Sequence, residues 1–121
     1  MIKLPQTEEQ LMEYIWDLRK AFSKDLLDKY PEPKPAQTTL ATLLKRLTEK
    51  GFITYETFGN SRAYTPLIQK EDYFEIHLNH LVEQHFNNSA FSFASFFTQK
   101  SKMSKKELEA LKKIVEDQLK D

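Results

Sequence analysis

The chain lacks cysteine, has only two glycines and contains no long hydrophobic run among its 121 residues. Without cysteine, disulfides, thiolate metal sites and a cysteine nucleophile are excluded. Gly51 and Gly59 are too few for a glycine-rich phosphate loop, and no nucleophile elbow or HExxH pattern is present. No apolar stretch approaches the roughly 20 residues that span a bilayer, and the N-terminus lacks a signal-peptide pattern. We therefore expect a soluble cytoplasmic protein that is not an enzyme and holds no cofactor.

The chain also has no excess of either charge, because 18 basic and 18 acidic residues give a formal net charge of zero. The distribution is uneven: residues 1–33 carry a net charge of −2, residues 34–65 carry +3, and residues 66–121 carry −1. A basic segment of this kind favours contact with nucleic acid. The excess is modest, however, so a single chain would bind phosphates weakly at physiological salt.

Leucine spacing predicts a helix over residues 37–50 with one apolar face. That face consists of Leu40, Leu43, Leu44 and Leu47. Gly51 suits the left-handed position that ends many helices. Two helices are expected before it, one at about residues 7–20 and a short one at 24–29, and the prolines of residues 31–35 stop the second. In the first, Leu11, Ile15, Leu18 and Phe22 form the apolar stripe, with Met12 and Trp16 toward the other flank.

A hairpin is predicted directly after this helix. β-Branched and aromatic residues indicate strands at 52–58 and 62–67 around the turn at 59–61, and Pro66 suits an edge strand. A helix followed by a basic-tipped hairpin is typical of a winged helix that binds a DNA groove. The expected fold is mainly α (α+β), with a winged helix-turn-helix DNA-binding domain over residues 1–69.

The polar side of the helix and the hairpin tip form the expected DNA-binding surface. Threonine methyls and hydroxyls can meet base edges, and basic side chains can contact phosphate or guanine. The expected residues are Thr38, Thr39, Thr42, Lys45, Arg46, Asn60, Ser61 and Arg62. Alternatively, the helix is a plain amphipathic one with a solvated face, and Arg46 pairs with Glu49 or Asp17.

Residues 70–121 are expected to form a helical dimerisation region. About three helices are predicted there, too few to enclose their own apolar surface, including five phenylalanines between positions 86 and 97. A second copy of the chain would cover that surface and double the phosphate contacts, giving a homodimer that reads two half-sites. The expected dimerisation residues are Phe74, Leu78, Leu81, Phe86, Phe93, Phe96, Phe97, Leu108, Leu111 and Val115. An ordinary intramolecular core is the alternative.

Two other readings stay open at this point. His77 and His80 lie three residues apart on a predicted helix and could share a metal with Glu83 or Glu75, but no third ligand is fixed by the sequence. His85 lies on an apolar stripe, where a core or interface histidine is commoner, so we assign no metal or catalytic residue. A winged-helix protein–protein interaction module without DNA binding is the other alternative, since the net charge is zero.

The chain resembles the penicillinase-repressor family of winged-helix regulators, of the BlaI, MecI and CopY type. The resemblance is carried by residues 9–16 (EQLMEYIW), 39–53 (TLATLLKRLTEKGFI), 64–67 (YTPL) and 104–115. It implies a homodimeric, sequence-specific transcriptional repressor that binds a palindromic DNA operator. In members of that family the regulated genes give β-lactam resistance or copper export, and a membrane sensor-protease relieves repression by cutting the dimerisation helices.

This sequence departs from the family pattern in three places. Basic residues are frequent in the family at the positions of Thr38 and Ala41, so the recognition face here is less cationic. The Asn-Phe bond that is cut in the β-lactamase regulators would fall near Phe96-Phe97, where the asparagine is absent. The C-terminal cysteines of copper-responsive members are also absent. The operator sequence, the regulated genes and the inducing signal are therefore open.

Overall fold

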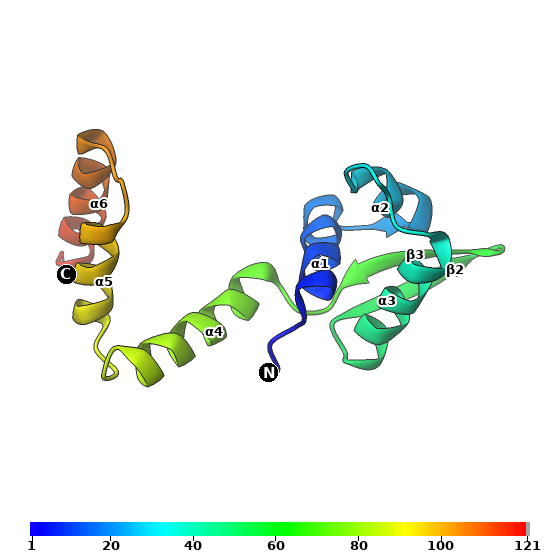
Figure 1. Cartoon of the computed structure of the whole chain (residues 1–121), viewed down its shortest axis with the longest axis horizontal. Helices are drawn as coiled ribbons and strands as arrows, with labels where there is room; N and C mark the ends of the chain where they lie inside the picture. Colours follow the sequence, from blue (N-terminus) through cyan, green and yellow to red (C-terminus); the bar gives the residue numbers. More distant parts are fainter. Residues whose placement is uncertain (121) are drawn as a thin grey trace. The chain divides into compact units, whose positions relative to one another are not determined.

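A computed structural model describes residues 1–120; Asp121, the last residue of the expected helical region, lies outside the described residues. The chain divides into two compact units, one over residues 1–77 and one from Leu78 onward. This division differs from the expected boundary at residue 69, because the first turns of the fourth helix belong to the N-terminal unit. Figure 1 shows the elements in order. They are α1 (Gln6–Leu18), β1 (Ala21–Phe22), α2 (Ser23–Lys29), α3 (Gln37–Glu49), β2 (Ile53–Phe58), β3 (Ser61–Pro66), α4 (Lys70–His85), α5 (Ala90–Lys100) and α6 (Lys105–Gln118).

A three-stranded antiparallel sheet in the order β1-β3-β2 lies beside the helices of the N-terminal unit. The hairpin of β2 and β3 is confirmed, and Tyr55 faces Tyr64 in its register. The expectation that Pro66 marks an edge strand is wrong, because β3 is the central strand. Proline is tolerated there because it is the last residue of the strand, paired with Ile53.

The first helix ends two residues earlier than the sequence suggests. Arg19 adopts a positive φ of 68°, and the chain then forms β1 directly after the residues where the helix was expected to end. Phe22, placed on the apolar stripe of the helix by its spacing, is instead an exposed strand residue. Met12 and Trp16 belong to the core rather than to the opposite flank, and the Trp16 Nε1–H donates to the Ile68 carbonyl at 2.8 Å.

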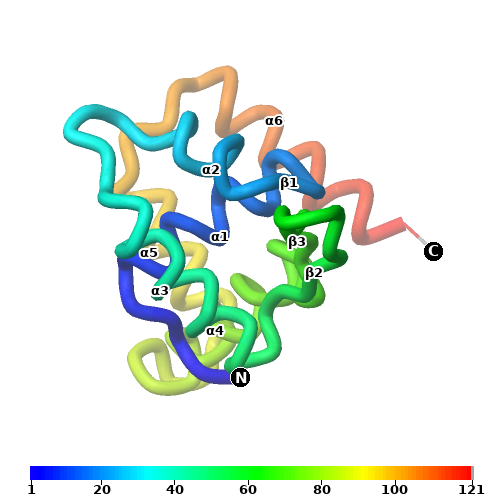
Figure 2. Tube along the Cα trace, turned by 90° about the vertical axis from the view of Figure 1, so that its right-hand side faces the viewer, coloured from blue at the N-terminus to red at the C-terminus, as the bar shows by residue number. Residues whose placement is uncertain are grey.

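An extended loop over residues 30–36 joins α2 to α3, as the prolines predict (Figure 2). Lys34 folds back from this loop onto the end of α2. Its Nζ donates to the carbonyls of Leu27 at 3.2 Å, Asp28 at 3.3 Å and Tyr30 at 2.6 Å. The last carbonyls of a helix lack most of their intrahelical partners, so Lys34 acts as a cap for α2, together with the Tyr30 N–H, which also donates to the Leu27 carbonyl.

Tyr73 in α4 ties three segments of the N-terminal unit together. Its ring is fully buried, and its hydroxyl accepts from the Leu4 N–H at 2.9 Å and donates to Glu9 Oε2 at 2.6 Å. Burial, together with the bond to Glu9, raises the pKa of the Tyr73 hydroxyl. Burial also acts to raise the pKa of Glu9, but hydrogen bonds from Lys3 and Tyr73 outweigh it and hold that pKa below its usual range. The start of α4 is therefore locked to the N-terminal segment and to α1.

We expect Tyr73→Phe to lower the free energy of unfolding by about 1–3 kcal/mol, because the buried Leu4 N–H loses its acceptor. Urea denaturation of the full chain measures this change. Tyr55→Phe is the matched control, since the half-exposed Tyr55 hydroxyl makes no hydrogen bond within residues 1–120. Equal midpoints for the two variants would contradict the locking role of Tyr73.

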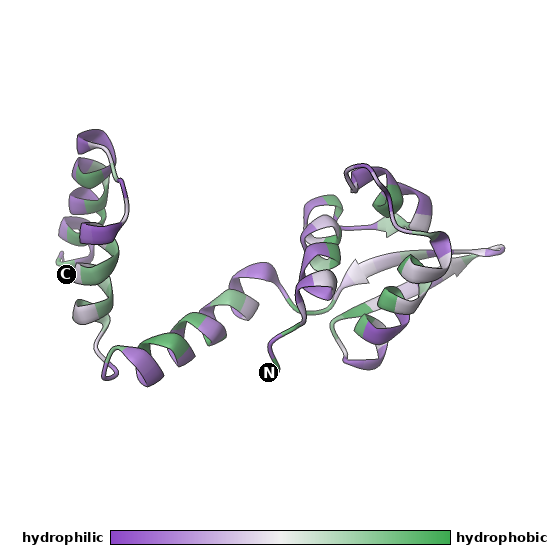
Figure 3. Ribbon diagram, viewed as in Figure 1, coloured by the Kyte–Doolittle hydropathy of each residue, from purple (hydrophilic) through white to green (hydrophobic). Residues whose placement is uncertain are grey.

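The helices of the second unit begin with the caps that the sequence indicates. Ser89 caps α5 by accepting from the Ser92 N–H at 3.0 Å. Ser104 and Glu107 form a capping box at the start of α6, with both hydrogen bonds at 3.1 Å. Both helices contain hydrophobic residues (green in Figure 3), yet no residue from Leu78 to Lys120 is buried. The helices of this unit thus do not enclose its apolar surface by themselves.

Candidate nucleic-acid interface

The leucine seam fixes how α3 is oriented in the N-terminal unit. Its four leucines are 0–7% exposed and pack in the core with α1 and the sheet. The helix ends in a Schellman arrangement, with the Phe52 N–H donating to the Leu47 carbonyl at 3.0 Å and the Gly51 N–H to the Thr48 carbonyl at 3.1 Å. Gly51 has a φ of 79°, the left-handed value predicted for it. The buried seam and the C-terminal end of α3 are therefore held, and the opposite side of α3 faces solvent.

The expected recognition residues of α3 lie on that exposed side. They are Thr38, Thr39, Thr42, Lys45 and Arg46. The Thr42 hydroxyl donates to the Thr38 carbonyl at 3.0 Å, which fixes its rotamer and leaves its oxygen lone pairs open to solvent. Lys45 lies 4.0 Å from Glu49, an exposed pair that contributes little stability.

Arg46 forms no ion pair within the part of the chain that the structure describes. Of the two partners considered for it, Glu49 lies beside Lys45, and Asp17 is bound by Lys29, whose hydrogen bond lowers the pKa of that carboxyl. Its guanidinium is thus available for an external anion.

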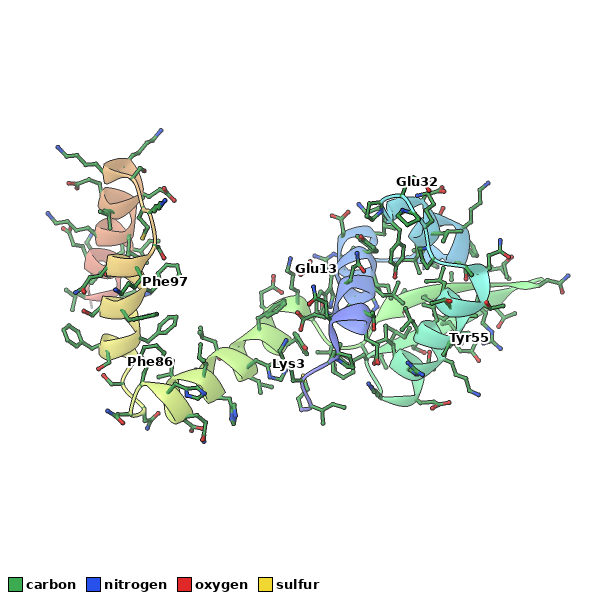
Figure 4. All side chains as sticks on the ribbon, viewed as in Figure 1. Lys3, Glu13, Glu32, Tyr55, Phe86 and Phe97 are labelled. Atoms are coloured by element: carbon green, nitrogen blue, oxygen red, sulfur yellow. The ribbon has the colours of Figure 1, made fainter. Side chains whose placement is uncertain are left out.

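The hairpin presents the second group of expected residues. Asn60, Ser61 and Arg62 are exposed at its tip, where Gly59 turns the chain with a φ of 62°. The Arg62 guanidinium lies 4.3 Å from the ring centroid of Tyr55 on the neighbouring strand, a cation–π contact (Tyr55 is labelled in Figure 4). This contact orients the side chain while leaving the N–H edges of its guanidinium free to donate.

Two of the five basic residues in segment 34–65 are engaged inside the protein. Lys34 caps α2, and Lys50 forms an ion pair with the buried Glu8 at 2.5 Å. The net charge of +3 therefore overstates what this segment offers an external anion. The basic residues of this segment that remain available to such an anion are Lys45, Arg46 and Arg62.

A cation that the sequence did not single out lies beside the hairpin tip. Pairing of β1 with β3 brings residues 22–24 next to residues 60–62, around a hollow of about 270 Å³. Lys24 and Arg62 both line it. No sequence signal could reveal this, because β1 has only two residues and shows no strand periodicity.

A larger hollow of about 740 Å³ lies along α1 and the start of α4. Its charged side chains have both signs and largely pair with each other: Lys70 contacts Glu13 at 2.9 Å, and Lys29 contacts Asp17. This mixture creates no field of one sign, so it gives no reason to place a polyanion there.

The described residues offer no third ligand for a metal ion bound by His77 and His80. Within residues 1–120, no three histidine, aspartate or glutamate side chains come together to hold a metal ion. His77 instead packs edge-on against Tyr73, with ring centroids 4.4 Å apart. No described helix is long and apolar enough to cross a membrane.

Comparison with solved structures identifies the fold class. The chain is similar to the solution structure of the DNA binding domain of the repressor BlaI, with a TM-score of 0.50 and 28% identity. The match covers 60% of this chain and 94% of that domain. The N-terminal unit is therefore a winged helix, in which the β2–β3 hairpin is the wing.

Comparison of sequences identifies the family. The model of the penicillinase repressor family matches residues 4–117. The chain is also 26% identical over 121 residues to the penicillinase repressor of Bacillus licheniformis, covering 97% of this chain and 94% of the relative. The chain belongs to the penicillinase repressor family.

Proposed function

We propose that this protein is a homodimeric, sequence-specific DNA-binding transcriptional repressor. The exposed side of α3 enters the major groove of a palindromic operator, and the wing contacts the backbone. The observation that carries the proposal is the orientation of α3: its leucines are buried, while its threonines, Lys45 and Arg46 face solvent. Two relatives support it, one called a penicillinase repressor and the other the DNA binding domain of a repressor.

The proposal of a homodimer is based on the exposed phenylalanines of the second unit. Phe96 and Phe97 are 51% and 49% exposed, and Phe91 is 80% exposed. Soluble monomers seldom leave so many large apolar side chains in water. A second copy brings the same surface and two-fold symmetry, which matches two half-sites of an operator. It also doubles the number of cations available to the DNA.

Arg46→Ala and Arg62→Ala are expected to weaken duplex binding roughly tenfold each without lowering the melting temperature. Both side chains are exposed, and a contact of arginine with phosphate or guanine contributes about 1–3 kcal/mol. Fluorescence anisotropy with a labelled duplex measures the affinity. Lys29→Gln is the control, because Lys29 is bound to Asp17 and lines the larger hollow instead of the wing. If both arginine variants bind like the control, the placement of the surface on α3 and the wing is wrong.

A winged-helix module that binds another protein is the second candidate. The observations that favour it are the zero net charge and the engagement of Lys34 and Lys50 inside the protein. The salt dependence of binding to bulk duplex DNA separates the two functions. A DNA-binding protein loses affinity as salt rises, with a slope set by the phosphates it neutralises. Absence of binding even at low salt would favour the protein-binding module.

A further inference from the structure

The hollow beside the wing has the chemistry of an anion site. Besides Lys24 and Arg62, it is lined by Ser23, Asn60 and Ser61, with the aromatic rings of Phe22 and Tyr64 as apolar walls. Two cations, two hydroxyls and one amide thus converge, and none of the lining residues is acidic. A site that offers donors and positive charge without a carboxylate selects an anion with several acceptor oxygens.

The polar side chains of this hollow have no competing partners. Neither Lys24 nor Arg62 forms an ion pair within residues 1–120, and the side chains of Ser23, Asn60 and Ser61 make no hydrogen bond there. The nearest acidic residue in sequence, Asp25, accepts from the Phe22 N–H at 3.0 Å and is thereby held at the start of α2. The donors of the hollow therefore remain available to an external group.

Three features hold the two sides of the hollow in place. Phe22 pairs with Ala63 in the sheet, so the residues that follow β1 stay beside the wing. The ring of Phe22 also contacts the ring of Phe58 edge-on, with centroids 6.1 Å apart. On the wing itself, the ring of Tyr55 lies under Arg62. The site is thus assembled before any ligand arrives.

We propose that this hollow binds one phosphodiester of the DNA backbone, with Lys24 and Arg62 on the same phosphate. This inference rests on the proposed function and deepens it: it adds Ser23 and Lys24 to the interface and joins α2 to the wing in one backbone contact. A DNA phosphate fits better than a free anion, because the exposed tip of the wing is part of the wall. Lys24 also adds a positive charge to the interface, whereas the charges of Lys34 and Lys50 are engaged inside the protein.

The test is the salt dependence of duplex binding for Lys24→Gln in the full chain. Each neutralised phosphate contributes about 0.9 to the slope of log K against log salt. Because Arg62 stays on the same phosphate, Lys24→Gln should lose part of that amount per chain and bind several-fold more weakly at 0.1 M salt. Lys29→Gln, at the other end of the same helix, should keep the slope of the original protein. Lys24 is exposed, so circular dichroism melting should show the same fold in all proteins.

A double variant tests whether the two cations share one phosphate. If they do, the loss of affinity for Lys24→Gln combined with Arg62→Gln should differ from the product of the single losses. Strict additivity would overturn the single-phosphate arrangement. Inorganic phosphate, added at constant ionic strength, should not compete with duplex at millimolar concentration; competition that Lys24→Gln abolishes would assign the site to a free anion instead.

The outcomes separate this inference from the proposed function. If the original protein binds duplex and Arg46→Ala weakens binding, but Lys24→Gln keeps the original slope, the hollow binds no phosphate while the repressor function stands. If the original protein shows no salt-dependent binding to duplex, the proposed function fails first, and the phosphodiester site fails with it.

Discussion

Replacing Lys50 by methionine is expected to lower the free energy of unfolding by about 3 kcal/mol. Its partner Glu8, on α1, is 2% exposed, and Lys50 is the cation that compensates its charge, at 2.5 Å. Removing one member of a buried ion pair leaves an uncompensated charge in a medium that solvates it poorly, which typically costs about 3–5 kcal/mol. The lower end applies here because the Lys50 side chain is 28% exposed.

Lys45→Met is the matched control for this measurement. It removes a lysine from α3, five residues before Lys50, but the pair with Glu49 is 4.0 Å long and both side chains are mostly exposed. Such pairs contribute at most about 0.5–1 kcal/mol. Urea denaturation of both variants gives the comparison. Adding Glu8→Gln to Lys50→Met should recover part of the loss, since no buried charge then remains. Equal losses for Lys50→Met and Lys45→Met would contradict this account.

The Glu8–Lys50 pair also has a consequence for function. Lys50 is the C-cap residue of α3, so the pair ties the end of that helix to the start of α1. Together with the leucine seam, it sets the angle at which the threonine face is presented. A loss of DNA affinity in Lys50→Met that disappears at low temperature, where the folded state is again populated, would assign the effect to stability rather than to contact.

The sequence predicts the parts of this fold that depend on local patterns. The seam of Leu40 and its neighbours follows from helical periodicity, and the left-handed Gly51 follows from the end of that pattern. The caps at Ser89 and Ser104 are equally local, because each side chain bonds a backbone N–H three residues away. Each of these features is decided within a few residues, so the linear order of side chains contains the information.

The features that the sequence could not reveal depend on distant partners. Lys50 looks like a free cation until α1 brings Glu8 to it, 42 residues away in the chain. Tyr73 looks like a helix residue beside the apolar Phe74, but contacts with Leu4 and Glu9 make it the more buried of the two. Strand β1 exists only because β3 offers it a partner. The net charge of a segment therefore does not reveal that Lys34 and Lys50 are engaged inside the protein and are unavailable to DNA.

Replacing both Phe93 and Phe97 by serine is expected to convert the proposed homodimer to monomer at micromolar concentration. Phe86, Phe93, Phe96 and Phe97 form a chain of ring contacts, with centroids 5.4 Å apart for Phe86–Phe93 and Phe86–Phe96 and 6.0 Å apart for Phe93–Phe97 (Phe86 and Phe97 are labelled in Figure 4). Burying a phenylalanine contributes about 1.5–3 kcal/mol, so losing two rings from each chain weakens association by several orders of magnitude.

Sedimentation velocity of the full chain measures the change, and Ala94→Ser is the control for introducing serine into α5 at an exposed position. Operator binding should weaken in parallel, because the two half-sites are then no longer bound by linked domains and the gain from effective concentration is lost. The winged helix should keep its own melting transition, since its core contains neither phenylalanine. A double variant that still sediments as a dimer would remove these rings from the interface. An original protein that is monomeric at tens of micromolar would remove the homodimer itself, and the exposed phenylalanines would then need a different partner.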